Sequence, residues 1–387
     1  MINKKIIYIA NIRMPTEKAH GHQIGKMCEQ FSLLEKEVEL WLPTRKNDIN
    51  QDMFSYYSLA NNFKIKKIKS FDPTFLFGAF EKWYIRFQAA FFIVSLFFYL
   101  LFKRDKKNYI FYIRDEYLIP VLELFSKNIS WECHALPSHL KFYQKYIIKC
   151  AAVIILTKKM KEELVGLDVA DNKILISPDA VDFKIFDINL GKEEARKKLN
   201  LPADKIILGY TGSFKTKAMD KGLDDIIKAL KLLAGKNNKI ILAAIGGSPQ
   251  DIEYYKKRAE ASEVLTNCLF IDKVNQNQLA IYQKAFDMLL MPFPNVRHYA
   301  YFMSPLKMFE YMASERPIIS SDLPSIREVL NEGNCLFCQP DNPIDLAKKI
   351  EMILADPGLA ERISQRAYQD VKLYTWEKRA ENILNFI

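Results

Sequence analysis

The chain has 387 residues, of which 49% are hydrophobic and 26% charged, with a net charge of +10. This balance, with only 13 Gly and 16 Pro, is typical of a globular protein of two or three domains and excludes a low-complexity or fibrous chain. The six cysteines are scattered along the sequence, which excludes a disulfide scaffold and indicates a reducing compartment. The apolar run near the start is too short for a signal peptide, so we expect a cytoplasmic protein.

Short β-branched runs alternate with helical patterns, which is typical of parallel sheets with crossover helices. The predicted strands are residues 6–10, 38–42, 109–113, 129–133, 152–157 and 174–177, then 206–210, 240–245, 268–271, 288–291, 317–320 and 335–337. Helices are predicted over residues 139–150, 223–233 and 344–354. The pattern lapses at residues 178–191. We therefore predict an α/β chain of two doubly wound, Rossmann-like domains, residues 1–180 and 190–370, with ligands bound at the carboxyl ends of the strands.

The most apolar stretch is residues 87–102, which run directly into the basic segment 103–107. A membrane-spanning helix needs about 20 apolar residues, so this run is short for a span. We interpret it first as a core helix that covers a sheet. The alternative is a membrane-embedded hairpin or monotopic patch, with the basic segment at the headgroups of an anionic membrane.

The charge is concentrated in the first half of the chain. Residues 1–170 carry 26 Lys and Arg against 17 Asp and Glu, a net charge of +9, and residues 171–387 carry only +1. A basic half favours nucleic acid, an anionic membrane or a phosphorylated substrate as partner. No RNP-like motif, zinc finger or helix-turn-helix signal accompanies the charge, so we expect no nucleic acid.

Motif patterns exclude several kinds of site. Residues 21–27 are similar to the P-loop pattern, but they are one residue too short for it and lack its final Ser or Thr. No Gly-x-Gly-x-x-Gly, Gly-x-Ser-x-Gly or Asp-x-Asp sequence occurs, which argues against a dehydrogenase, a serine hydrolase and a metal-bridged nucleotide-sugar site. We expect the lone pair Cys335 and Cys338 to be core residues rather than zinc ligands.

Residues 304–322 carry the most informative motif. Pro305 suits the first turn of a helix, whose free amides attract a diphosphate. Lys307 adds a positive charge beside them, and Glu310 follows about one turn later on the same face. A carboxylate at that position can accept hydrogen bonds from a ribose diol, although Glu310 taken alone is better interpreted as a solvated helix residue.

This segment resembles the donor-binding signature of glycosyltransferase family 4, a family of retaining enzymes with the GT-B fold. The signature is a Glu, seven residues, a second Glu and a run of small residues. Residues 310–317 match its second half, whereas Phe302 stands at the position of the first Glu and a Ser-Pro-Leu-Lys variant follows. The resemblance implies two domains facing across a cleft and a nucleotide-sugar donor bound by the second domain, with contacts at Ser304, Pro305 and Leu306.

Further segments resemble the family in its own order. Gly212 and Ser213, followed by Lys221, resemble the element that grips the diphosphate. Many members have Arg where this chain has Ser213, so we expect Lys307 to supply the missing charge. Lys273 and Val274 resemble the loop whose backbone contacts the base. Residues 177–183 resemble the interdomain linker, and residues 374–387 resemble the C-terminal helix that completes the first domain.

The first half contributes three more candidates. Residues 15–23 resemble the family's glycine-containing loop after the first strand, where Gly21 would let backbone approach the donor phosphate or the acceptor. His134 resembles a strand-end histidine that hydrogen-bonds the donor sugar or orients the reaction centre, although by itself it would be interpreted as a cap. Residues 114–116 are interpreted equally well as cleft-facing groups or as charges at a helix N-terminus.

The resemblance implies a retaining, hexosyltransferase-type enzyme that transfers a sugar from a nucleotide sugar to a glycan or lipid-linked acceptor in envelope polysaccharide biosynthesis. Glu310 would hold the ribose, Lys221 and Lys307 would stabilise the leaving diphosphate, and His134 would act at the reaction centre. No metal and no cofactor is expected. Two alternatives stay open: a nucleotide-sugar epimerase or hydrolase of the same fold, and a non-catalytic sugar-nucleotide-binding partner. We expect the protein in the cytoplasm, in peripheral contact with the inner face of the membrane.

Overall fold

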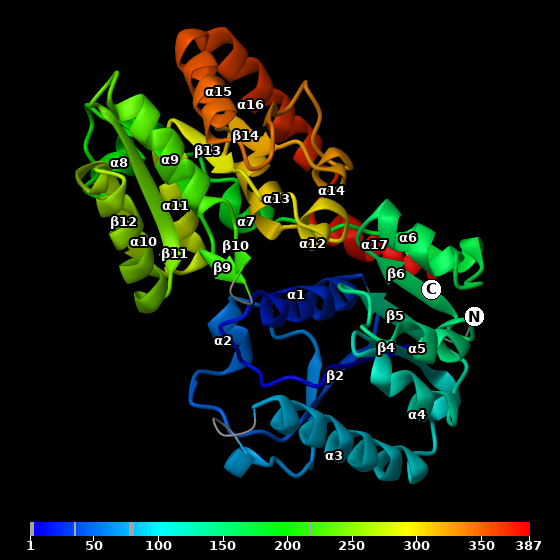
Figure 1. Cartoon of the computed structure of the whole chain (residues 1–387). Helices are drawn as coiled ribbons and strands as arrows, with labels where there is room; N and C mark the ends of the chain where they lie inside the picture. Colours follow the sequence, from blue (N-terminus) through cyan, green and yellow to red (C-terminus); the bar gives the residue numbers. More distant parts are fainter. Residues whose placement is uncertain (1–3, 35, 77–80, 217–218) are drawn as a thin grey trace. The chain divides into compact units, whose positions relative to one another are not determined.

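The computed structural model describes residues 4–34, 36–76, 81–216 and 219–387, apart from the side chains of residues 81 and 82. The chain forms two compact units. One consists of Met1–Pro178 with Trp376–Ile387, and the other of Asp179–Thr375. Each unit has a parallel sheet with helices on both faces (Figure 1), as the alternating pattern predicts.

In the described part of the first unit, seven parallel strands pair in the order β3-β2-β1-β4-β5-β6-β7. They are β1 (Lys5–Ile9), β2 (Val38–Pro43), β3 (Lys64–Ile68), β4 (Tyr109–Ile113), β5 (Ile129–Cys133), β6 (Ala152–Ile155) and β7 (Ile174–Ile176). The helices are α1 (Ala19–Leu33), α2 (Met53–Tyr57), α3 (Glu81–Leu101), α4 (Ile119–Glu123), α5 (Leu140–Ile147), α6 (Lys158–Val165) and α17 (Trp376–Phe386). Helix α1 packs against α17 on one face of the sheet, and α3 and α4 lie on the other (Figure 1).

In the described part of the second unit, six parallel strands pair in the order β12-β11-β8-β13-β14-β15, and a short hairpin stands apart. The strands are β8 (Ile206–Thr211), β11 (Ile240–Gly247), β12 (Cys268–Asp272), β13 (Met288–Met291), β14 (Ile318–Ser321) and β15 (Leu336–Cys338), with β9 (Lys215–Thr216) and β10 (Met219–Asp220) in the hairpin. The helices are α7 (Phe183–Phe186), α8 (Lys192–Lys198), α9 (Leu223–Ala234), α10 (Pro249–Ala261), α11 (Gln276–Ala285), α12 (Arg297–Tyr301), α13 (Leu306–Ala313), α14 (Pro324–Arg327), α15 (Pro343–Ala355) and α16 (Pro357–Val371).

The second sheet separates two apolar cores. Along β8, Ile207 packs into the core on one face, and Leu208 and Tyr210 pack into the core on the other, because successive side chains of a strand point to opposite faces. Gly209 leaves room for the ring of Phe286, since a Cβ at Gly209 would lie 2.0 Å from that ring. The carboxyl end of β8 is therefore held rigidly from both sides.

All the predicted strands are present, each within two residues of its predicted ends. The sequence analysis missed β3, which has the sequence KIKKI and whose lysines are largely exposed. This strand lies at the edge of its sheet, and lysines are typical of edges that must not pair with another chain. It lacks the β-branched run by which the other strands were found.

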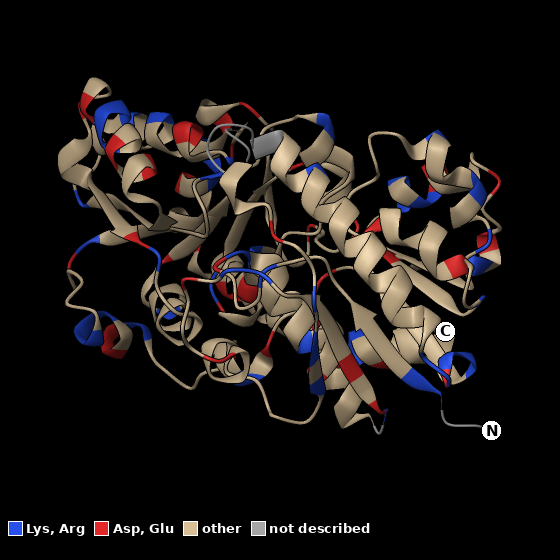
Figure 2. Ribbon diagram, turned by 90° about the horizontal axis from the view of Figure 1, so that it is seen from below, with Lys and Arg blue, Asp and Glu red and all other residues tan. Residues whose placement is uncertain are grey.

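Residues 87–102 belong mainly to α3, and their interpretation as a core helix is correct for one face only. The buried stripe is Gln88, Phe92, Leu96 and Leu100. The opposite stripe is apolar yet exposed, and it consists of Trp83, Phe87, Phe91, Val94, Phe98 and Leu101. Within the described ranges, Trp83–Leu101 is the one helical segment long and apolar enough to cross a membrane by length and composition, with a mean hydropathy of 1.7. Figure 2 shows α3 as a long helix almost without charge.

Candidate functional site

The first group of candidate residues lies at the carboxyl end of β8. Gly212 follows that strand with φ +103°, and Gly246 near the end of β11 has φ +112°, a backbone conformation that favours glycine. The amide of Gly212 donates to the carbonyl of Ile245 at 2.9 Å. A Cβ on Gly246 would lie 2.8 Å from the Gly212 oxygen. The two loops thus touch, and Ser213 stands exposed on the turn.

Lys307 lies directly beneath this turn. Its ammonium group is buried and, among the described residues, has no hydrogen-bond partner. Nζ lies 3.7 Å from the centroid of the Tyr210 ring and 5.1 Å from that of Phe293, so aromatic faces are what stabilise the cation. A Cβ on Gly212 would lie 3.6 Å from Cε of Lys307. Burial, reinforced by the nearby charge of Lys221, holds the pKa of Lys307 well below its ordinary value.

Lys221 is the second cation of the group. Burial lowers its pKa to about 8, and no ion pair joins it to a carboxylate among the described residues. The next residue, Gly222, has φ +94°, and a Cβ there would lie 1.8 Å from the carbonyl oxygen of Pro292, which fixes the backbone. The neighbouring carboxylate of Asp220 already accepts from the Gly222 amide and from the Tyr255 hydroxyl.

Two desolvated lysines without a counter-ion are costly unless an anion joins them. Lys307 lies under a glycine turn, and both lysines lie near the carboxyl edge of a doubly wound sheet, which is where such folds bind phosphates. This arrangement is a candidate anion site of the second unit.

Glu310 lies one turn along α13 from Lys307. Burial raises the pKa of its carboxyl to about 7, although a hydrogen bond from Gln283 and the charge of Lys307 favour the ionised form. Nε2 of the fully buried Gln283 lies 3.4 Å from Oε2 of Glu310 and 3.1 Å from Oγ1 of Thr211. The Tyr311 hydroxyl in turn accepts from the Thr211 amide at 2.8 Å. This network fixes Glu310 beside the end of β8.

The start of α13 differs from the prediction by one residue. The helix begins at Leu306, and Pro305 precedes it as the N-cap residue with an extended backbone, so Pro305 does not lie in the first turn. The hydroxyl of Ser304 accepts the amide of Asp179 at 2.9 Å and so holds the start of the second unit. The side chain of Ser304 therefore has a structural partner, and Leu306 and Lys307 are the first two residues of the helix.

Lys273 and Val274 follow β12, the edge strand of the same sheet, two strands away from β8. Lys273 is exposed, and its amide donates to the carboxylate of Asp272 at 2.7 Å. These residues share the carboxyl edge of the sheet with Gly212 and Lys221, at its far side.

Gly21 is not in a loop, contrary to the prediction. It lies in the first turn of α1 and is buried. A Cβ at this position would lie 2.2 Å from the Tyr57 hydroxyl and 2.6 Å from Cγ2 of Thr16. Tyr57 donates to the carbonyl of Thr16 at 2.7 Å. The missing side chain of Gly21 therefore makes room for Tyr57. The expected approach of Gly21 to the donor phosphate or the acceptor stays a prediction.

His134 follows β5 and is held by a buried ion pair. Its Nε2 lies 2.8 Å from Oε1 of Glu132, and Nη2 of Arg379 on α17 lies 2.7 Å from the same oxygen. Glu132 and Arg379 are each 2% exposed at the side chain. Burial alone would raise the pKa of Glu132, but Arg379 and His134 together hold it well below its usual value. Because an ionised carboxylate only accepts, Nε2 of His134 carries the proton, and the ring orientation is fixed.

The charged group at the end of β4, residues 114–116, has partners in the first unit. Nη1 of Arg114 donates to Gln23 at 3.2 Å, and the carboxylate of Asp115 accepts the Asn11 amide at 2.8 Å. Burial, together with Arg114, lowers the pKa of His20 to about 4, so His20 is neutral. Arg379 and Gln283 were missed from the sequence, because each acts through a contact distant along the chain. Glu132 was missed although it lies two residues before His134, because its ion pair with Arg379 is distant along the chain.

Comparison with known proteins now adds to this geometry. Residues 191–370 match the family model described as glycosyl transferases group 1. A curated uncharacterized glycosyltransferase of Methanocaldococcus jannaschii is 26% identical over 60% of this chain and 58% of its own length. The capsular polysaccharide biosynthesis glycosyltransferase CapM of Staphylococcus aureus is 24% identical over 60% of each chain. The chain thus spans little more than half the length of these relatives.

The solved structure of Anabaena HepE in complex with UDP and glucose superposes with a TM-score of 0.71 at 11% identity, over 99% of this chain and 98% of that one. A structural similarity of this size at such low sequence identity shows that the two proteins share a fold. The chain is a two-domain α/β protein with the GT-B fold, as predicted. More particularly, its second unit contains the segment that matches the glycosyl transferases group 1 model, and the candidate anion site lies in this segment.

Proposed function

We propose that the protein is a retaining glycosyltransferase of family 4 that transfers a sugar, of the hexose type, from a nucleotide sugar. The observation that carries this proposal is the pair of desolvated lysines Lys221 and Lys307, for which the described residues supply no ion pair and of which Lys307 lies beneath the Gly212 turn. The match of residues 191–370 to the glycosyl transferases group 1 model supports it. So does the UDP in the HepE structure, which has the same fold.

Each residue of the anion site has a proposed role. The diphosphate lies against Lys221, Lys307 and the amides of the turn and of the α13 N-terminus, with Ser213 beside it. Glu310 accepts hydrogen bonds from the ribose diol, and Lys273 and Val274 contact the base through the loop after β12. Lys307 becomes fully charged when the diphosphate arrives, because the anion replaces the hydration that burial removed.

The lysines act mainly on the leaving group. As the glycosidic bond breaks, negative charge grows on the diphosphate, and preorganised cations stabilise that charge without reorganising. The acceptor hydroxyl attacks the anomeric carbon on the face that the diphosphate leaves, and the leaving phosphate takes the proton. With two lysines to neutralise the diphosphate, the proposed reaction needs no divalent metal and no cofactor. His134, fixed by Glu132, orients the sugar through a hydrogen bond.

We further propose a glycan or lipid-linked acceptor of envelope polysaccharide, in line with the role of CapM in capsular polysaccharide biosynthesis. The enzyme would act in the cytoplasm with the exposed stripe of α3 on an anionic bilayer. That stripe includes Trp83, 54% exposed, and Phe98, 54% exposed, and aromatic side chains of this kind partition into the interfacial region. The basic segment 103–107, at the C-terminal end of α3, supplies attraction for anionic lipids.

The first test is nucleotide binding with excess EDTA. We would measure the thermal shift of the full chain with UDP, GDP, ADP and CMP and with their sugar conjugates. A ligand at about 100 times its Kd adds about 2.7 kcal/mol to stability, so a shift for one nucleotide is expected. It should be lost in Lys307→Met and kept in Lys236→Met, which changes an exposed lysine of the same unit. No shift with any nucleotide would refute the proposal.

Turnover distinguishes the enzyme from the alternatives. Product that forms only with acceptor, with retained anomeric configuration, is expected. Product without acceptor would indicate an epimerase or hydrolase, and binding without turnover a non-catalytic partner. Flotation with anionic liposomes tests the membrane contact, and Phe98→Ser with Phe91→Ser should abolish it.

A further inference from the structure

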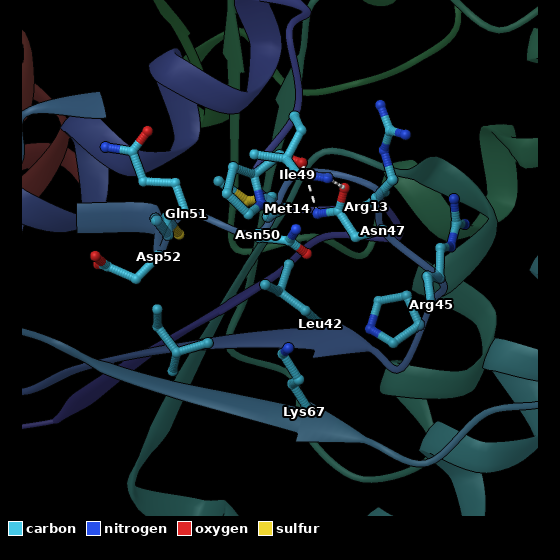
Figure 3. A pocket seen from close by; sticks show the side chains of 14 residues that line it. Arg13, Met14, Leu42, Arg45, Asn47, Ile49, Asn50, Gln51, Asp52 and Lys67 are labelled. Atoms are coloured by element: carbon cyan, nitrogen blue, oxygen red, sulfur yellow. Dashed lines mark hydrogen bonds between the residues drawn. The ribbon is translucent and has the colours of Figure 1, made fainter. Parts of the chain in front are cut away.

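A cavity lies in the first unit. It has a volume of about 700 Å³ and opens at the carboxyl ends of β1, β2 and β3. The loop after β1 contributes Arg13, the segment after β2 contributes Arg45, and β3 contributes Lys67 (Figure 3). Buried Leu42 and Met53 form part of its wall, so the cavity combines cations with an apolar surface.

Arg45 is a half-buried cation that, among the described residues, forms no ion pair, although the charges of Asp72 and Asp115 favour its charged form. Its Nη2 donates to neutral oxygens, namely the carbonyl and Oδ1 of Asn11, at 3.0 and 2.8 Å, and Oε1 of Gln88. Its Nε is buried and, among the described residues, has no hydrogen-bond partner. Burial lowers the pKa of the guanidinium from its ordinary value, although it stays charged. An unsatisfied buried donor on a cation is costly unless a ligand completes it.

The other charges leave this cavity positive. Lys67 is exposed to it and, within the described ranges, forms no hydrogen bond or ion pair. Arg13 pairs with Glu17 at 2.5 Å. The acid that lines the cavity, Asp52, is engaged as the N-cap of α2, where its carboxylate accepts the amides of Phe54 and Ser55. The lining of the cavity therefore has three cations, Arg13, Arg45 and Lys67, and one acid, Asp52, whose carboxylate is already engaged.

The cavity is also joined to the apolar helix. Gln88, the partner of Arg45, lies on the buried stripe of α3. Tyr84 of α3 donates to Asp72 at 2.9 Å, and the same carboxylate accepts the amide of Lys46 at 3.2 Å. The segment that lines the cavity is thus anchored to the helix whose opposite face is exposed and apolar.

We propose that this cavity binds the phosphate group of an acceptor substrate, with Lys67, Arg13 and Arg45 as its ligands and the apolar wall against the adjoining sugar or hydrocarbon. This inference rests on the proposed function, since it names the class of acceptor that the enzyme uses. Bidentate guanidinium groups suit a phosphate better than a neutral hydroxyl. The phosphate comes either from a soluble phosphorylated acceptor or from a lipid-linked one.

The test uses the full chain with Lys307→Met, so that the anion site of the second unit does not bind the probe. Inorganic pyrophosphate, titrated calorimetrically, represents the soluble source. Phosphatidylcholine vesicles with or without undecaprenyl phosphate represent the lipid source. Lys67→Gln with Arg13→Gln removes two cations near the surface, and Lys64→Gln, an exposed lysine on the same strand that does not line the cavity, is the control.

We expect affinity for one probe to fall about tenfold or more in the Lys67/Arg13 variant and to be unchanged in Lys64→Gln. A loss of affinity for pyrophosphate identifies a soluble acceptor, and a loss of affinity for the vesicles alone identifies a lipid-linked acceptor. The inference is overturned if the Lys67/Arg13 substitutions leave the affinity for both probes unchanged, or if neither probe binds. Nucleotide binding of the Lys67/Arg13 variant with Lys307 intact is measured in parallel. Normal nucleotide shifts beside a failed cavity test would refute the cavity alone, whereas absent shifts would refute the proposed function.

Discussion

The carboxyl group of Glu310 allows a test with two opposite expected effects. Its ionised form should lower the stability of the unliganded protein, whereas the same charge should strengthen nucleotide binding. The pKa of Glu310 is about 7 in the folded protein, against 4.5 for an ordinary glutamate. Glu310→Gln keeps the shape and can still accept the hydrogen bond from Gln283. The substitution removes the ionisation and leaves the network.

The sign of the effect follows from linkage. A folded-state pKa above the unfolded value means that the folded state holds its proton longer, so wild-type stability falls as pH rises from about 4.5 to about 7 and then levels off. Relative to Glu310→Gln, the wild type should lose about 1 kcal/mol by about pH 5.5 and about 3 kcal/mol by about pH 8.5. The difference in Tm between the two proteins should therefore widen by roughly 4–8 °C over this range.

Differential scanning calorimetry of the unliganded proteins at several pH values measures the difference in Tm between the wild type and Glu310→Gln. Glu260→Gln, at an exposed position of α10, is the control and should give a constant difference. A constant difference for Glu310→Gln would show that its carboxyl is solvated, and the reasoning would be wrong. With nucleotide present, the order reverses: Glu310→Gln should bind about 10–100-fold more weakly if the carboxylate holds a diol.

Three further outcomes are expected. Lys307→Met should raise the Tm of the unliganded protein, because it removes an unpaired buried cation, while it weakens nucleotide binding; a lower Tm would contradict the desolvation argument. Lys221→Ala should lower kcat more than it raises KM, and equal losses in kcat and affinity would show a binding role only. In the wild type, nucleotide affinity should fall as pH rises above about 8, where Lys221 loses its proton. Arg379→Met should cost about 3–5 kcal/mol by leaving Glu132 buried without its cation, and urea denaturation that shows under 1 kcal/mol would mean that the pair is not desolvated.

The sequence predicted the parts of the molecule that local patterns encode. The strands with β-branched runs, the helix that carries Lys307 and Glu310, and the Gly212 turn could all be placed from spacing and from the family resemblance. The lysine-rich edge strand β3 could not, because its side chains are chosen to avoid pairing rather than to fill a core.

Features that depend on contacts between residues far apart in the sequence could not be predicted. That Lys307 is buried against Tyr210 follows from the way α13 packs on β8, and nothing near Lys307 in the sequence indicates it. Gly21 stands next to a run that resembles a loop, and nothing near it in the sequence indicates that the Tyr57 hydroxyl, far along the chain, occupies the space of its missing side chain. The exposed stripe of α3 has the composition of a core helix, and its exposure can be seen only once the sheet beneath it is known.

The two points where the chain passes from one unit to the other have a consequence for how such proteins can be rebuilt. In the second unit, the Val181 amide donates to the Tyr374 carbonyl at 2.9 Å, and Val181 pairs with Thr375. In the first, Nε of Arg379 donates to the Pro178 carbonyl at 2.9 Å. Each unit therefore has its cut ends side by side, as an inserted domain does. Residues 179–375 could be excised as an autonomous module, or replaced by the equivalent module of another protein, with one short peptide closing the gap.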